Sequence, residues 1–91
     1  MNLTNNQAFN TKLIKQIIRV PKEESAFFYF QLEANENIAF YSTLEESLKQ
    51  GHRDIEVICS EDFSEEIDQI VKNLLKKCNG VSLSKEVIND E

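Results

Sequence analysis

The sequence contains little of what many enzymes and nucleotide-binding proteins need. It has two glycines, one proline, one histidine and no tryptophan. No GxGxxG, Walker or GxSxG motif occurs, which excludes the common phosphate-binding loops and the nucleophile elbow of hydrolases. No stretch approaches the ~20 apolar residues that cross a bilayer. The first ten residues also lack the basic and apolar segments of a secretory signal.

Cysteine and histidine are too few for the usual thiol and metal chemistry. Cys59 and Cys78 lie too far apart for a CxxC motif, and a secreted chain of this size usually carries more cysteines. We therefore expect a reducing cytoplasm, with both thiols free and buried in the core. His52 and Asp54 are only two of the three or four ligands that a zinc site needs, so we expect no metal and no cofactor.

The net charge of the chain is negative. Ten basic and sixteen acidic residues give a net charge of −6, which disfavours nucleic acid and anionic membranes as partners. The strands expected over residues 12–20 and 54–60 also lack the aromatic side chains on which RNA-binding modules stack bases. With 91 residues, 41% of them hydrophobic, the chain fits one folded domain. We predict a polar, disordered arm over 1–10, a domain over 11–88 and a tail over 89–91.

Hydrophobic periodicity predicts six elements. Residues 11–20 alternate as a strand, with Ile14, Ile18 and Val20 on the buried side, and Pro21 ends that strand. The other elements are expected to be a helix over 22–35, strands over 38–44 and 54–60, a helix over 62–78 and an edge strand over 81–88. The order β-α-β-β-α-β predicts an α+β, ferredoxin-like split β-α-β fold. This fold has a four-stranded antiparallel sheet with both helices on one face.

The second helix and the loop before it carry further local signals. The polar loop over 45–53 is expected to start with one helical turn. Asp62 is a candidate N-cap, and Asn79-Gly80 ends the helix. The (i, i+4) spacing of Asp68 and Lys72 predicts an ion pair on its surface.

The first helix is apolar on two sides. A rotation of 100° per residue places Ala26, Phe27, Phe30 and Ala34 on one side, and Phe28, Tyr29 and Leu32 on another. One sheet and one further helix have difficulty covering both sides. We therefore expect Phe28, Tyr29 and Leu32 to form an interface with a second chain. The alternative is that one of these rings packs beneath a loop of the same molecule.

Three segments resemble a bacterial domain-of-unknown-function family, number 4911. They are the run VPKE before the aromatic helix, the segment LEANENIAFYSTLE and the segment DIEVICSEDFSEEIDQIVKNL, together roughly residues 17 to 77. The positions that match the family pattern are Leu32, Glu33, Glu36, Ile38, Ala39, Ser42 and Thr43. Asn37 stands where the family tends to have glycine.

The family looks similar to ferredoxin-like regulatory domains of the ACT type, and this implies side-by-side pairing with a small effector at the pair interface. An effector would then lie near Arg19 and Lys22, beside Pro21, or near the turn with Glu33 and Glu36. The ACT effector loop commonly carries glycine where this chain has RVPK, which argues against an amino-acid effector.

No arrangement of residues favours catalysis, so we predict no catalytic residues and a non-enzymatic protein. His52 has Asp54 as a potential orienting partner, but no nucleophile is expected nearby. An enzyme using Glu33, Glu36 and Asp54 would require one deep polar pocket. The favoured function is a regulatory or binding domain that forms a homodimer and binds a small effector at the dimer interface. The alternative is an adaptor that docks another protein through the apolar helix.

Overall fold

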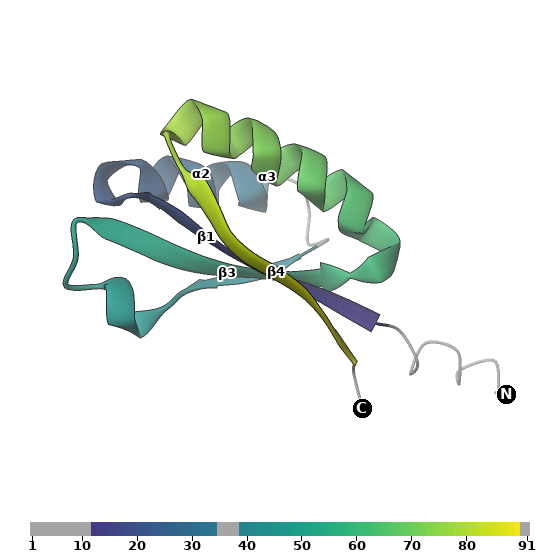
Figure 1. Ribbon diagram of the computed structural model, residues 1–91. Helices are drawn as coiled ribbons and strands as arrows, with labels where there is room; N and C mark the ends of the chain where they lie inside the picture. The colour runs from purple at the N-terminus through teal and green to yellow at the C-terminus, as the bar shows by residue number, and fades with distance from the viewer. Residues whose placement is uncertain (1–11, 35–38, 90–91) are drawn as a thin grey trace, which may run out of the picture.

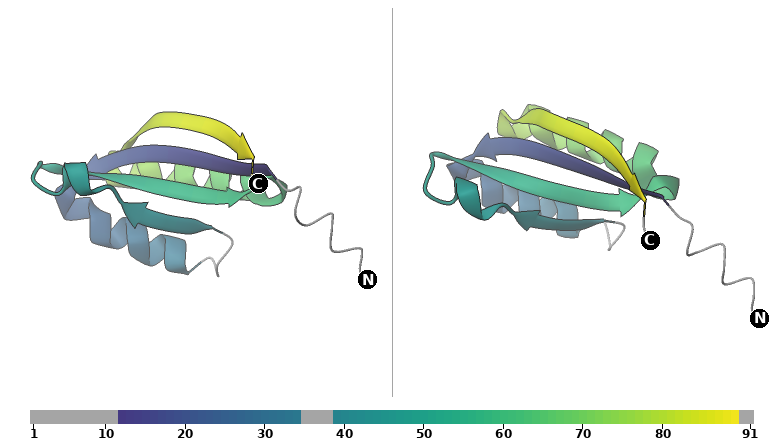
Figure 2. Two further views of the ribbon diagram at one scale, coloured as in Figure 1. Left: turned by 90° about the horizontal axis from the view of Figure 1, so that it is seen from below. Right: turned by 60° about the horizontal axis from the view of Figure 1, so that its bottom comes forward.

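The computed structural model describes residues 12–34 and 39–89, and the predicted N-terminal arm and the last two residues lie outside this part. Four strands form one antiparallel sheet in the order β2-β3-β1-β4 (Figure 1). The strands are β1 (Lys12–Pro21), β2 (Phe40–Thr43), β3 (His52–Ser60) and β4 (Val81–Asn89). Helices α2 (Ser25–Glu33) and α3 (Ser64–Cys78) lie on one face of the sheet (Figures 1 and 2). The ferredoxin-like split β-α-β fold is therefore confirmed.

Three single-turn 3₁₀ helices join these elements. They are η1 (Lys22–Glu24), η2 (Glu45–Ser47) and η3 (Glu61–Phe63). The helical turn expected at the start of the 45–53 loop is η2. Asp62 is not the N-cap that we expected. The cap lies two residues earlier, where Ser60 Oγ accepts a hydrogen bond from the Asp62 backbone N–H at 3.2 Å and starts η3 before α3 begins.

The core lies between the sheet and the two helices, as the alternation of the strands predicts. β1 buries its even-numbered side chains from Ile14 to Val20, and β3 buries Ile55, Val57 and Cys59. Helix α3 adds Ile67, Val71, Leu74 and Cys78 from one stripe. Both cysteines are free and buried, and burial is the main cause that raises the pKa of each thiol. The thiols are thus kept protonated and poorly reactive.

β4 is an edge strand that the helices leave largely uncovered. Every residue from Val81 to Val87 is exposed. Its register with β1 shifts between Ile17 and Ile18, so that Leu83 is an extra residue in the pairing. Such a bulge, together with Lys85 and Glu86, blunts an edge against uncontrolled strand pairing.

Candidate interaction surface

Helix α2 faces the sheet with the stripe that we expected outside. Phe28 is 0% exposed and Leu32 is 4% exposed, and both belong to the hydrophobic core. Tyr29 is half-buried, its hydroxyl lies against Thr43 Oγ1 of β2, and its ring contacts Tyr41. The expectation that Phe28, Tyr29 and Leu32 form an exposed interface is therefore wrong. The reason is that the inner face of the sheet lies beneath α2, and these are the bulkiest apolar side chains on one side of that helix.

The opposite stripe points to solvent. Phe30 is 66% exposed and Phe27 is 41% exposed, and both Ala26 and Ala34 are exposed. We call these four residues the outward stripe of α2. None of them is charged, and the two large rings lie on a helix that is already fully packed on its inner side. An exposed patch built around large aromatic rings is typical of a contact surface rather than of a solvated helix.

The open face of the sheet, on the side away from the helices, is covered by cross-strand ion pairs. Lys15 Nζ lies 3.4 Å from Glu56 Oε2 of β3 and 3.8 Å from Glu86 Oε2 of β4. Arg19 forms a two-pronged pair with Asp54, from Nε to Oδ1 at 2.7 Å and from Nη2 to Oδ2 at 3.0 Å. β1 supplies the cations of these pairs and its neighbours the anions, while Phe40 of β2 on the same face remains 82% exposed.

The four residues predicted to bind a ligand do not form one site. Arg19 is occupied by Asp54, and the backbone N–H of Lys22 donates to the Gly51 carbonyl at 3.0 Å. Glu33 ends α2, about 16 Å along the helical path from Lys22 at 1.5 Å per residue. Glu36 lies outside the described residues. Effector binding at either end of α2 stays a prediction.

The residues considered for catalysis are separated or already paired. His52 Nε2 is 3.7 Å from Asp54 Oδ1, beyond hydrogen-bonding distance, and Asp54 is held by Arg19. Asp54 lies on the open face of the sheet, whereas Tyr41 lies on the helix face. Burial is the largest cause that raises the pKa of Tyr41, and the negative charge of Glu33 is the next, so Glu33 lies near the helix face. Glu33 and Asp54 therefore do not share a pocket. Within residues 12–34 and 39–89 no group of three or more His, Cys, Asp or Glu residues is placed to hold a metal ion.

The loop before β3 is fixed to the sheet by side chains that sequence reasoning missed. Ser47, 2% exposed, donates to the Leu44 carbonyl at 2.9 Å and accepts from the Asp54 N–H at 3.0 Å. Arg53 Nη1 lies within 3.0–3.2 Å of three loop carbonyls. No sequence pattern shows that the serine and the arginine of this polar segment turn back onto the backbone.

The Arg19–Asp54 pair predicts a pH-dependent stability. Hydrogen bonds from Arg19 are the largest cause that lowers the pKa of the Asp54 carboxyl, and burial opposes them. Because the folded-state pKa of Asp54 is lowered, its ion pair stabilises the protein fully above the unfolded-state pKa of about 4. This stabilisation is lost as the pH falls through the folded-state pKa. We expect Asp54→Asn to lower the free energy of unfolding at neutral pH and to approach the wild type in acid. Urea unfolding of both proteins between neutral and acid pH measures this difference in the free energy of unfolding. A difference that is the same at all pH values would contradict an ionic role for Asp54.

Comparisons with known proteins assign this chain to no family. No protein-family model matches the chain, and no curated protein matches it. The resemblance to family 4911 therefore has no support from these comparisons. Among solved structures, the chain is similar to "De novo designed protein Foldit4" at 17% identity and a TM-score of 0.45. That match covers 89% of this chain and 97% of the designed chain. No helix within the described ranges is long and apolar enough to cross a membrane.

Proposed function

We propose that this chain is a non-enzymatic binding domain that self-associates through the outward stripe of α2. The observation that carries the proposal is the exposure of Phe27 and Phe30, at 41% and 66%, on a helix whose other side is already buried. Water must order around both rings in the monomer. A second copy would remove that apolar surface from solvent.

The outward stripe is self-complementary. Ala26, Phe30 and Ala34 are spaced four residues apart, and such i±4 rows form the ridges along which helices pack. In an antiparallel pair of α2 helices related by a two-fold axis at Phe30, Ala26 of one copy faces Ala34 of the other. Phe30 then has a small residue on either side in its own row, which leaves room beside it for the Phe30 ring of the second copy, whereas Phe27 lies at the border of this contact. A two-fold interface requires such a pattern, because the same patch serves both partners.

The expected dimer is weak. Four phenylalanine rings with these exposures bury roughly 400 Å² when covered, well below the ~1,200 Å² of a standard interface. We therefore expect a dissociation constant of roughly 10–100 μM. Each copy carries a net charge of −6, so repulsion between the copies opposes association. Added salt screens this repulsion and should strengthen the dimer.

Sedimentation from low to high micromolar concentration tests the proposal. The wild type should shift from monomer to dimer, and Phe30→Asp should remain monomeric with an unchanged far-UV circular dichroism spectrum. Phe40→Asp is the matched control, because Phe40 is 82% exposed but belongs to β2 on the open face. This control should dimerise like the wild type.

Two outcomes contradict self-association through α2. One is a wild type that remains monomeric at high micromolar concentration and high salt. In that case the same stripe would suit an adaptor that docks a different protein. The other is an equal loss of dimer in Phe30→Asp and Phe40→Asp, which would place the contact elsewhere or reduce it to an effect of charge.

A further inference from the structure

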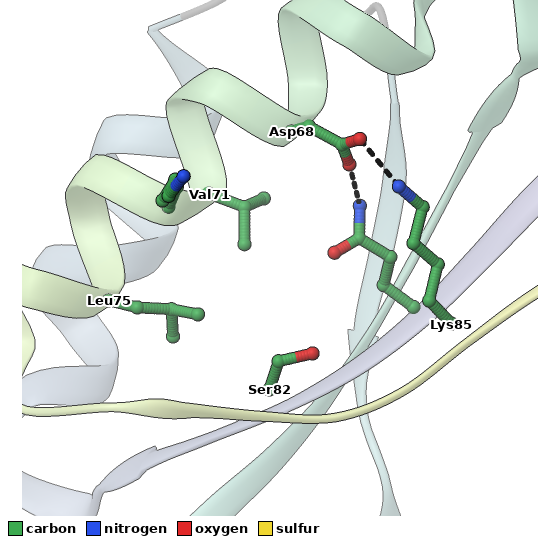
Figure 3. A pocket seen from close by; sticks show the side chains of 7 residues that line it. Asp68, Val71, Leu75, Ser82 and Lys85 are labelled. Atoms are coloured by element: carbon green, nitrogen blue, oxygen red, sulfur yellow. Dashed lines mark hydrogen bonds and ion pairs between the residues drawn. The ribbon is translucent and has the colours of Figure 1, made fainter.

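A cavity of about 270 Å³ lies between α3 and β4 (Figure 3). β4 is the edge strand opposite β2 in the sheet. Val71 and Leu75 project into it from α3, and Ser82 faces them from β4 (Figure 3). One end is closed by Asp68 and Lys85, whose Oδ2 and Nζ atoms are 2.5 Å apart.

Gln16 in the cavity wall is an unusual residue for its position. It belongs to the row of β1 side chains that is otherwise Ile14, Ile18 and Val20, and it is only 5% exposed. Its Nε2 donates to Asp68 Oδ1 at 2.9 Å, but no donor among the described residues reaches its Oε1. Buried amide oxygens are nearly always hydrogen-bonded. An aliphatic side chain would fill this place without that need.

The orientation of the Gln16 amide is set by Asp68. A reversed amide would bring Oε1 against a carboxylate oxygen, where two acceptors repel. Nε2 therefore stays on Asp68, and the planar group directs Oε1 away from that carboxylate, on the side where Gln16 lines the cavity. A water molecule or a ligand hydroxyl can donate to this oxygen, but only a ligand with an apolar body also covers the wall of Val71 and Leu75.

The charges around the cavity favour an anion. Asp68 is neutralised by Lys85, and not by Lys72 as the helical spacing predicted. Lys72 also lines the cavity, and no carboxylate in the described part of the chain pairs with it. The charge of Lys72 is therefore not balanced by a carboxylate in the cavity wall. The cavity thus combines an acceptor that needs a donor, an apolar wall and a cation at its exposed side.

We propose that this cavity binds a small monocarboxylic acid with an apolar body and a hydroxyl group at its far end. The hydroxyl donates to Gln16 Oε1, the body covers Val71 and Leu75, and the carboxylate pairs with Lys72. A cavity of about 270 Å³ holds a molecule of about ten non-hydrogen atoms, for which a dissociation constant of roughly 0.1–1 mM is expected. The site does not depend on self-association through α2.

The test uses 4-hydroxybenzoate and benzoate, which differ only in the hydroxyl group. In ¹H–¹⁵N NMR titrations of the full chain, both should shift the amides of Gln16, Leu75 and Ser82 saturably. 4-Hydroxybenzoate should bind about fivefold tighter, as one neutral hydrogen bond allows. Gln16→Met keeps an unbranched side chain of similar length but removes the acceptor, and should abolish this preference. Lys72→Gln, at an exposed position, should weaken both acids equally.

Three results would overturn the proposal. They are the absence of saturable shifts at the cavity amides, equal wild-type affinity for the two acids, and an undiminished affinity of both acids in Lys72→Gln. The last two do not require Gln16→Met to fold. Binding by Phe30→Asp separates this site from the proposed function, because that variant should lose the dimer and keep the affinity for 4-hydroxybenzoate.

Discussion

Phe28→Ala should remove a large share of the protein's free energy of unfolding. Phe28 is fully buried between the sheet and the helices, and removing a buried ring leaves a cavity that typically costs about 3–5 kcal/mol. A chain of 91 residues has a total free energy of unfolding of roughly 5–14 kcal/mol. Urea unfolding followed by circular dichroism measures the loss. We expect the urea midpoint to fall in proportion to the lost free energy, with an unchanged m value.

Phe30→Ala is the control for this result. It deletes the same side chain two residues away on the same helix, but from a position that is 66% exposed. We expect its free energy of unfolding to fall by less than about 1 kcal/mol in the monomer. Equal losses for the two variants would mean that α2 is rotated about its axis relative to the arrangement described above.

This contrast shows where sequence reasoning stopped short. Helical periodicity revealed that α2 is apolar on two sides but did not reveal which side faces the sheet. One signal was available: Glu33 falls seven residues after Ala26, only about 20° away around the helix, so a charged residue borders the outward stripe. No charged residue within α2 interrupts the side that holds Phe28 and Leu32. The position of Glu33 therefore indicates that the side with Phe28 and Leu32 faces the sheet, which the aromatic residues alone do not show.

The strands were easier to predict than the candidate sites. Alternation with a period of two fixes which side chains of β1 and β3 are buried, and a one-residue shift would expose them all. The cavity beside Gln16 was not predicted, because its wall is formed by residues of β1, α3 and β4 that only the tertiary packing brings together. The Asp68–Lys85 pair likewise joins residues 17 positions apart, and no local spacing rule identifies such a partner.

The end of α3 shows a second, different limit of local patterns. The pair Asn79-Gly80 was expected to stop the helix, and it does. However, Asn79 takes the left-handed conformation at φ 57°, and neither glycine has a positive φ. Gly80 is instead required for space. A Cβ atom built on it would lie 2.7 Å from Leu75 Cδ2, 2.8 Å from the Arg19 carbonyl oxygen and 2.8 Å from Val20 Cγ1.

Gly80→Ala should therefore destabilise the protein by about 1–3 kcal/mol, the usual cost of overpacking. Leu75 can rotate away, but the Arg19 oxygen belongs to the backbone of β1 and cannot move without disturbing the sheet. Removing the flexible neighbour in a Leu75→Ala, Gly80→Ala double variant should consequently fail to restore stability. Urea unfolding of each variant gives the free energies.

Gly51→Ala supplies the opposite expectation with the same chemical change. Nothing lies within 4 Å of a Cβ atom placed at Gly51, and its φ is not positive. Alanine there restricts the unfolded chain at no cost to the native loop, so the free energy of unfolding should rise by up to about 1 kcal/mol. The carbonyl that accepts from the Lys22 N–H is retained. If both substitutions shift stability in the same direction, the close approach of α3 to β1 at Gly80 is not what constrains this residue.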